Sequence, residues 1–237
     1  MQYGSIPAGG LGTRLQPIGF SKELAPVVGR AVIEYLIERM VLAGIKKIFI
    51  NTAEDKTDLI RYLSTKSKYR DYLIYLVRDR KGLLDGITQP AQFLRPDDEL
   101  FFGLPDTIWY PLDGFSQIRD QQGKLVLGLF DTGTPKSFDS VVINKDNQIQ
   151  SIEVKVDSPK SKWTWGIGRF TVSEVPFLSK LATQQKGTPL FGVAVNDYIK
   201  TNQAYAVELA HSSFIDIGQP EAYSQAESFV TNNTNSK

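Results

Sequence analysis

A glycine-rich run near the start of the chain limits the folds that the chain can adopt. Residues 8–15 read Ala-Gly-Gly-Leu-Gly-Thr-Arg-Leu and follow the apolar Ile6. Glycines let backbone N–H groups converge on an anion without obstruction by Cβ atoms, and Arg14 adds a cation at the end of the run. The pattern predicts a strand followed by a phosphate-binding loop, with contacts from Ala8, Gly9, Gly10, Gly12 and Thr13.

Two common nucleotide loops fit this run poorly. No glycine in it begins the Gly-x-x-x-x-Gly-Lys-Ser/Thr string of a Walker loop. In the dinucleotide fingerprint, the third glycine or alanine after Gly10 and Gly12 would fall on Leu15. The acidic residues Glu54 and Asp55 also lie beyond the usual spacing of about 20 residues for a ribose-binding acid. A dinucleotide-dependent oxidoreductase is therefore a weak alternative.

Composition argues against several classes of protein. The chain has 237 residues, of which 41% are hydrophobic, and a net charge near +1. This length suffices for one globular core, and the balanced charge argues against a nucleic-acid partner. No apolar run approaches the ~20 residues of a membrane span, so a membrane partner is not expected. With no cysteine and no signal-peptide pattern at the N-terminus, the predicted location is the cytoplasm.

Hydrophobic periodicity predicts an α/β chain whose halves differ. In the first half strands and helices alternate, which predicts a Rossmann-like, doubly wound, mainly parallel sheet whose strand ends line one crevice. The predicted strands there are 3–7, 47–51, 72–77 and 100–104, and the predicted helices are 32–43, 58–63 and 86–94. The second half is richer in strands, predicted at 125–130, 140–143, 149–155, 164–172, 205–209 and 214–217. Its predicted helices are 177–181, 193–199 and 220–229.

Two motifs give the chain a resemblance to a known family. Gly9-Gly10-x-Gly12-Thr13-Arg14-Leu15-x-Pro17 is followed by Ser21-Lys22-Glu23-Leu24-x-Pro26-Val27. Together they resemble the signature of the sugar-1-phosphate nucleotidylyltransferases, in particular the glucose-1-phosphate thymidylyl- and uridylyltransferases. The resemblance continues through Gly82-Leu83, Pro105-Asp106, Glu153-x-Lys155, Trp165-Gly166 and Asp216-Ile217-Gly218. It implies that a nucleoside triphosphate and a sugar-1-phosphate form an NDP-sugar and pyrophosphate.

The resemblance also implies a division of labour along the chain. We expect one catalytic domain over residues 1–230, with a nucleotide-binding half at 1–120 and a smaller, β-rich sugar-phosphate-binding half at 121–230. Residues 231–237 are expected to be a polar tail, too poor in apolar residues to pack. The oligomeric state stays open, a homo-oligomer included.

This reaction needs cations more than a general base, because the attacking phosphate oxygen is already an anion near neutral pH. The chain agrees with that demand, since His211 is its only histidine. Catalysis then rests on positioning and charge neutralisation. In the family, the residue matching Arg14 engages the leaving phosphates and the residue matching Lys22 contacts phosphates at the reacting centre. Alternatively, both are solvated surface cations.

Phosphate chemistry also implies a hard metal ion. Mg²⁺ usually binds phosphates together with one or two carboxylates. Asp106 and Asp216 resemble the metal-binding aspartates of the family, and each follows or ends a predicted strand. The alternatives are a turn for Asp106 and a cap of the helix that opens at Pro220 for Asp216.

The sugar-binding motif departs from the family. Lys155 resembles the lysine of a Glu-Lys-Pro motif that holds the sugar phosphate, and Gly166 resembles a glycine near the sugar ring. Here Val154 stands in place of the glutamate that accepts hydrogen bonds from sugar hydroxyls, and Glu153 would face the other side of its strand. Lys155 as an exposed strand residue, and Gly166 as a simple strand glycine, are the alternatives.

The base and the exact activity are less constrained. Glu23 and Gly82 match positions near the nucleotide, but Val77 stands where thymidylyltransferase-like sequences have a glutamine. A pyrimidine is preferred by analogy, since the chain lacks the extra domains of many purine-using relatives. Because the lysine motif is altered, a catalytically impaired regulatory or ligand-binding relative of the same fold remains the alternative to an enzyme.

Overall fold

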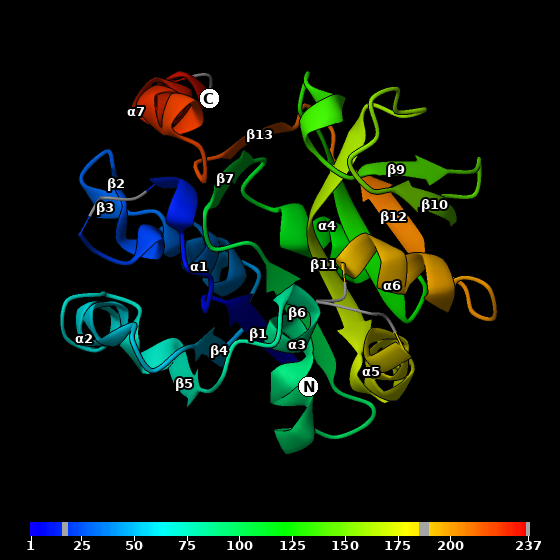
Figure 1. Ribbon diagram of the computed structural model, residues 1–237, viewed down its shortest axis with the longest axis horizontal. Coiled ribbons are helices and arrows are strands. Elements are labelled where there is room, and N and C mark those ends of the chain that lie inside the picture. The colour runs from blue at the N-terminus through cyan, green and yellow to red at the C-terminus, as the bar shows by residue number, and fades with distance from the viewer. Residues whose placement is uncertain (16–18, 185–189, 236–237) are drawn as a thin grey trace.

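The centre of the fold is a mixed β-sheet (Figure 1). The computed structural model describes residues 1–15, 19–184 and 190–235. Within them nine strands form one sheet, in which four strands of the first half run parallel in the order β6-β1-β4-β5. Their bounds are Glu99–Gly103 for β6, Gln2–Pro7 for β1, Ile48–Thr52 for β4 and Leu73–Val77 for β5. This parallel set confirms the α/β prediction for the first half.

Helices cover both faces of the sheet because its strands are apolar on both faces. Phe101 and Phe102 are buried neighbours on β6 and therefore point to opposite faces. Phe101 belongs to the cluster that receives α1 (Ile33–Leu42), α2 (Thr57–Thr65) and α4 (Gly114–Asp120). Phe102 belongs to the cluster that receives α3 (Leu83–Thr88), α5 (Val175–Gln184) and α6 (Phe191–Tyr198). The doubly wound architecture is thus confirmed.

The helix predicted at 86–94 begins earlier and ends earlier than expected. Helix α3 starts at Leu83, directly after Gly82, and gives way to a 3₁₀ turn over Gln89–Phe93. Pro90 lies at the start of this turn. Because proline has no N–H to donate and its ring clashes with the preceding turn, an α-helix does not continue through it.

The second half of the chain joins the same sheet through antiparallel pairing. Strand β11 (Trp163–Thr171) pairs with β6 on one side and with β8 (Leu125–Asp131) on the other. Strand β12 (Tyr205–Glu208) runs parallel to β8, and β9 (Ser140–Ile143) pairs with β10 (Ile149–Glu153) as a hairpin at the edge. The two halves therefore share a continuous sheet.

Two small two-stranded sheets lie apart from the central sheet, and of their strands the sequence predicted only β13. Strand β7 (Thr107–Tyr110) pairs antiparallel with β13 (Ser213–Asp216), and the short β2 (Pro26–Val27) pairs with β3 (Arg30–Ala31). The sequence pattern predicted β13 but missed β7 and α4. Strand β7 is only four residues long and its partner lies about a hundred residues along the chain, so local periodicity carries little signal for it.

The C-terminal helix corrects the expected tail. Helix α7 spans Pro220–Asn235, so it continues past residue 229 and through most of the segment predicted as an unpacked tail. It packs on residues of the first half through Ala226 and Val230. Beyond them polar contacts replace apolar ones: Ser213 Oγ donates to Asn233 Oδ1 at 2.7 Å. Residues 236–237 lie outside the described part of the chain.

Across the described residues, none of the helices combines the length and the apolar composition that crossing a bilayer requires.

The core makes a direct stability prediction at Phe102. This ring is fully buried. The centroids of the Phe170, Phe191 and Trp165 rings lie within 6.4 Å of its own centroid. Phe102→Ala should lower the free energy of unfolding by about 3–5 kcal/mol, because it removes apolar contacts and leaves a cavity. Phe93, which is 62% exposed, is the matched control: Phe93→Ala should change stability by less than about 0.5 kcal/mol. Urea unfolding of both variants measures the difference, and equal midpoints would contradict this account of the core.

Candidate functional site

A cavity of about 520 Å³ lies at the carboxyl ends of the parallel strands β1, β4 and β5. We call it the glycine-loop cavity. Its wall is formed by the glycine loop at residues 9–11, the segment 78–86, and the group Lys22, Asp106 and Asp216. Ligands of open α/β sheets bind at this edge, because the strand ends leave a crevice between the loops that follow them.

The glycine loop is fixed at its start by the neighbouring strand. The Ala8 N–H donates to the Asn51 carbonyl oxygen at 2.7 Å, which continues the pairing of β1 with β4. Gly12 has a φ of +66°, and a Cβ there would lie 3.0 Å from the Lys22 Cβ. The glycine therefore allows both the left-handed backbone and the close approach of Lys22.

Three of the predicted loop residues, Ala8, Gly12 and Thr13, do not line the cavity. The Ala8 side chain is fully buried and Thr13 is exposed on a 3₁₀ turn over Thr13–Leu15. Arg14 lies in the same turn, but its side chain is outside the described part of the structure, as is Pro17 of the motif. The predicted role of Arg14 thus stays a prediction.

Lys22 and Asp106 form an ion pair at the cavity wall, with side chains 18% and 15% exposed. Burial alone would lower the pKa of Lys22. The carboxylates of Asp106, Glu23 and Asp216 outweigh burial and raise the pKa above its ordinary value of 10.5. The ammonium of Lys22 therefore stays charged at neutral pH, beside an anion that holds it in place.

Backbone pairing brings Asp216 next to Asp106, although 110 positions separate them in the chain. In the β7–β13 register Asp216 stands opposite Thr107, and the Ile217 N–H donates to the Asp106 carbonyl oxygen at 3.0 Å. A Cβ at Gly218 would lie 2.9 Å from Asp216 Oδ1 and 3.5 Å from Asp106 Oδ2. The two carboxylates therefore face the same small space.

This carboxylate pair has the composition of a site for a hard cation that also binds phosphate. Among the described residues, no group of three or more His, Cys, Asp or Glu side chains forms a closed metal cage. Mg²⁺ rarely uses such cages: it prefers one or two carboxylates and completes its octahedron with phosphate oxygens and water. Asp106 and Asp216 suit that ion, and both line the cavity.

A run of charged residues that the sequence analysis missed forms another part of the wall. Arg78, Arg80 and Lys81 all line the cavity, just before Gly82. Arg80 Nε donates to the Gly9 carbonyl oxygen at 2.6 Å, and its guanidinium also pairs with Asp55. Since a trans peptide points its C=O and N–H in opposite directions, this bond turns the Gly10 N–H away from Arg80. The Arg-Asp-Arg-Lys run before a glycine was the available signal.

The backbone conformation at position 82 requires a glycine. Gly82 has a φ of +106°, a value that L side chains rarely adopt, and it is the residue immediately before α3. The Gly82 carbonyl oxygen accepts from the Gly86 N–H at 3.1 Å, which closes the first turn of that helix. Gly82 also lines the cavity, as the sequence analysis expected of a nucleotide-binding position.

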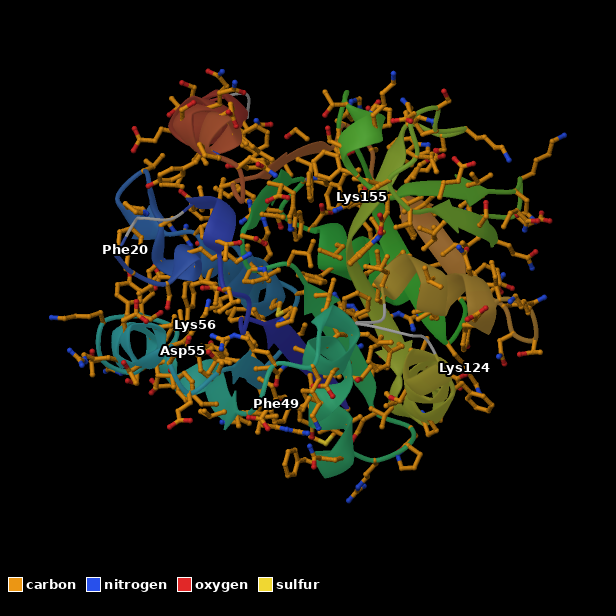
Figure 2. All side chains as sticks on the ribbon, viewed as in Figure 1. Phe20, Phe49, Asp55, Lys56, Lys124 and Lys155 are labelled. Carbon is orange, nitrogen blue, oxygen red and sulfur yellow. The ribbon has the colours of Figure 1, made fainter. Side chains whose placement is uncertain are left out.

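Glu23 does not line the glycine-loop cavity. Its side chain is fully buried and both carboxylate oxygens accept from Lys56 Nζ, at 2.7 and 2.6 Å. Burial raises the pKa of Glu23, and the Lys56 ammonium opposes that rise. Lys56 and Asp55 lie side by side at the start of α2 (Figure 2). Because Glu23 adjoins Lys22, the buried ion pair anchors the turn that carries Lys22.

Lys155 and Gly166 also lie outside the lining of the glycine-loop cavity. Lys155 follows β10, is exposed and has a φ of +48°, which is rare for a residue with a side chain (Figure 2). Gly166 sits at an irregularity in the β11–β8 register, where a Cβ would lie 2.7 Å from the Phe214 ring. Packing alone therefore requires glycine at 166.

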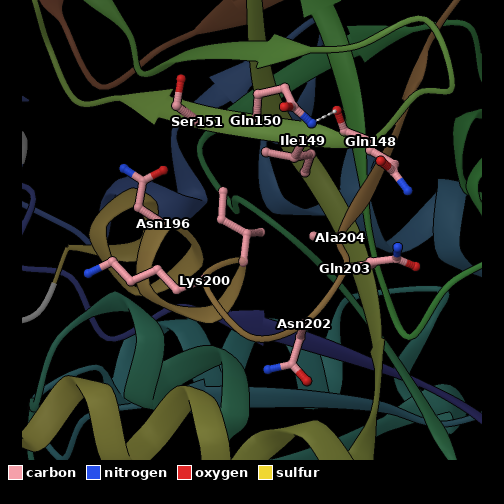
Figure 3. A pocket seen from close by; sticks show the side chains of 10 residues that line it. Gln148, Ile149, Gln150, Ser151, Asn196, Lys200, Asn202, Gln203 and Ala204 are labelled. Carbon is pink, nitrogen blue, oxygen red and sulfur yellow. Dashed lines mark hydrogen bonds between the residues drawn. The ribbon is translucent and has the colours of Figure 1, made fainter.

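A second cavity, of about 500 Å³, lies between β10 and α6 and has different chemistry (Figure 3). Amide side chains dominate its wall, and its one lysine, Lys200, pairs with Asp197 at 2.6 Å. Asn196 closes part of it by pairing with the strand backbone: Ile152 N–H donates to Asn196 Oδ1 and Asn196 Nδ2 donates to the Ile152 oxygen, both at 2.7 Å. The glycine-loop cavity is the better candidate for phosphate chemistry.

Comparisons with known proteins identify the family of this chain. A family model described as nucleotidyl transferase matches residues 4–233. The glucose-1-phosphate thymidylyltransferase of Neisseria meningitidis is 30% identical over 238 residues, covering 96% of this chain and 82% of that protein. The enzyme of the same name from Mycolicibacterium smegmatis is 27% identical over 236 residues, covering 96% of this chain and 81% of that protein.

Solved structures share the fold. A putative glucose-1-phosphate thymidylyltransferase from Bacillus anthracis superposes with a TM-score of 0.85 at 22% identity, over 97% of this chain and 95% of that one. A UDP-glucose pyrophosphorylase, solved with UDP-glucose, gives a TM-score of 0.83 at 18% identity, over 98% and 99%. The family match spans the glycine loop, Lys22 and both aspartates. The chain belongs to the sugar-1-phosphate nucleotidylyltransferase family.

Proposed function

We propose that this chain transfers a nucleotidyl group from a nucleoside triphosphate to a sugar-1-phosphate. A phosphate oxygen of the sugar-1-phosphate attacks the α-phosphorus, the bond between the α- and β-phosphates breaks, and pyrophosphate leaves. The attacking oxygen carries a negative charge already, so the step needs no proton transfer from it. The observation that carries this proposal is the convergence of the glycine loop, Lys22 and the Asp106–Asp216 pair on one cavity.

The cations of the cavity are suited to neutralise the negative charge that builds up on the leaving pyrophosphate in this step. The glycine loop offers backbone N–H groups for the phosphates that leave, and Arg14 lies at its end. Lys22 sits beside the loop and is held by Asp106, so its ammonium is positioned before substrate arrives. Preorganised charge of this kind stabilises a transition state without further rearrangement.

Asp106 and Asp216 are the residues that would hold Mg²⁺. When bound there, the ion supplies charge neutralisation for the triphosphate. The two carboxylates fit it because they share the space at Gly218 and line the same cavity as Lys22.

Substrate identity belongs to the same proposal. We expect a pyrimidine nucleotide near Gly82 and the sugar phosphate near Lys155 and Gly166, in an enzyme of the cytoplasm. The names of the curated relatives, glucose-1-phosphate thymidylyltransferase, favour a glucose-1-phosphate-like sugar and dTTP.

The function is tested by release of pyrophosphate. UTP, dTTP, CTP, ATP and GTP are each combined with a panel of sugar-1-phosphates in the presence of Mg²⁺. Release that requires one particular pair would establish the reaction and name both substrates. No release with any pair, from protein that still melts cooperatively, would contradict the proposal.

The carboxylate pair gives a prediction about metal dependence. Asp106→Asn and Asp216→Asn should each lower turnover at saturating nucleotide by about a hundredfold or more, because loss of a metal-binding charge removes several kcal/mol of stabilisation. Each should also weaken Mn²⁺ binding measured by electron paramagnetic resonance. Asp71 is 88% exposed and outside the cavity, so Asp71→Asn is the control and should behave as wild type. Wild-type turnover in either test variant would refute the metal role of that residue.

Arg80 gives a prediction about nucleotide binding. Arg80→Ala removes a charged hydrogen bond to the glycine loop and a cation from the cavity wall, so the KM for nucleotide should rise about tenfold to a hundredfold. Arg80→Lys keeps the charge but cannot bridge Gly9 and Asp55 in the same way, and should lie between. Arg70, 59% exposed and away from the cavity, supplies the control Arg70→Ala. An unchanged KM in Arg80→Ala would show that nucleotide binding does not depend on the hydrogen bond from Arg80 to the glycine loop.

A further inference from the structure

A partly buried carboxylate lies near Lys155 and has no role in the reaction described so far. Asp139 directly precedes β9, and its Oδ2 accepts from Trp165 Nε1 at 3.4 Å. The Trp165 ring packs on Phe191, with 4.2 Å between centroids. Burial raises the pKa of Asp139, while the Trp165 N–H and the charge of Lys155 oppose that rise. The Asp139 carboxylate thus contacts the Trp165 indole, and the charge of Lys155 acts on it.

The Asp139 carboxylate lies close to the side chain at position 154. A Cβ at Gly192 would be 3.3 Å from Asp139 Oδ2 and 2.9 Å from Val154 Cγ2. Both side chains therefore border the same residue of α6. Val154 supplies no hydrogen-bond acceptor, whereas Asp139, the residue before β9, brings a carboxylate to this spot.

Aromatic packing connects this place with the carboxylate pair of the candidate active site. Phe138 meets Phe214 edge to face, with ring centroids 5.6 Å apart. Phe214 and Asp216 are two residues apart on β13 and so point to the same face. The segment just before β9 therefore packs against the strand that carries Asp216.

We propose that Asp139 is a sugar-binding residue that accepts hydrogen bonds from hydroxyl groups of the sugar-1-phosphate, in place of a carboxylate at position 154. This inference rests on the proposed function and deepens it. Lys155 binds the phosphate of the same sugar, so one ligand spans the two charges. The ligand class is a neutral hexose-1-phosphate, because a single carboxylate with one nearby cation suits hydroxyl donors on the ring and an anionic group beside them.

The test separates binding of the sugar from binding of the nucleotide. Asp139→Asn keeps the shape of the side chain but weakens it as an acceptor. The KM for the sugar-1-phosphate should rise about tenfold to a hundredfold while the KM for nucleotide stays unchanged. Asp146→Asn, in the turn of the same hairpin, is the control and should leave both values unchanged. Wild-type protein should also discriminate against one monodeoxy analogue of the sugar, and Asp139→Asn should lose that discrimination.

Direct binding distinguishes failure of this inference from failure of the proposed function. Calorimetry with glucose-1-phosphate and related hexose-1-phosphates needs no turnover. Weaker binding by Asp139→Asn supports the sugar site even if no pyrophosphate is released by wild type, a result that would refute the proposed function alone. Equal binding by both proteins, with pyrophosphate release intact, overturns the inference.

A purely structural role of Asp139 would change the melting temperature but not the KM values. Asp139 also lies beside the first turn of α6, so its loss could lower the melting temperature. A lower melting temperature with unchanged KM values for both substrates would overturn the inference. If Asp139→Asn does not fold, Trp165→Phe removes the N–H that orients the carboxylate. It should raise the KM for the sugar-1-phosphate by a smaller factor, and an unchanged KM there would also count against the inference.

Discussion

Pairing of β7 with β13 is the interaction on which the candidate active site depends. Asp106 ends one loop of the first half and Asp216 ends a strand near the C-terminus, and only this antiparallel register makes them neighbours. The hydrogen bond from Ile217 to the Asp106 carbonyl oxygen then fixes the spacing of the two side chains. Helix α7 covers this small sheet from outside and packs on the first half. The last part of the chain thus supplies one carboxylate of the candidate site, and the first part supplies the other.

Charges in the cavity are arranged in alternation. Lys22 is held by Asp106, Arg80 by Asp55 and the Gly9 carbonyl oxygen, and the buried Glu23–Lys56 pair supports the turn beneath Lys22. A cluster of unpaired cations would repel itself and destabilise the loops that carry it. Pairing Lys22 and Arg80 with carboxylates reduces the repulsion among the cations of the cavity wall.

The sequence predicts local secondary structure better than it predicts contacts between residues that are far apart in the chain. The strand before the glycine loop and the parallel first half were predictable because hydrophobic periodicity and glycine spacing are local signals. Lys22, Gly82, Asp106 and Asp216, which line one cavity, were singled out by the family resemblance, since the pairing that makes the two aspartates neighbours is long-range. The burial of Glu23 was not predictable, since it depends on Lys56 from another loop. The last turns of α7 were missed because polar contacts such as Ser213 to Asn233 replace apolar packing there. Asp139 left no motif, and only the fold places it beside Val154.

Asn196 has a consequence for the behaviour of the protein in solution. Strand β10 is the last strand at its end of the sheet, and at its start the Ile149 N–H donates to the Ala204 carbonyl oxygen at 2.9 Å. Further along, at Ile152, the outer backbone groups of an edge strand would be open to any extended chain that aligned with them. The Asn196 carboxamide occupies both groups of Ile152, with a donor and an acceptor spaced like those of a peptide unit. One side chain thus imitates a short piece of a further strand. It ends the sheet from within the same molecule and takes up the Ile152 groups that edge-to-edge pairing with a second copy would need there.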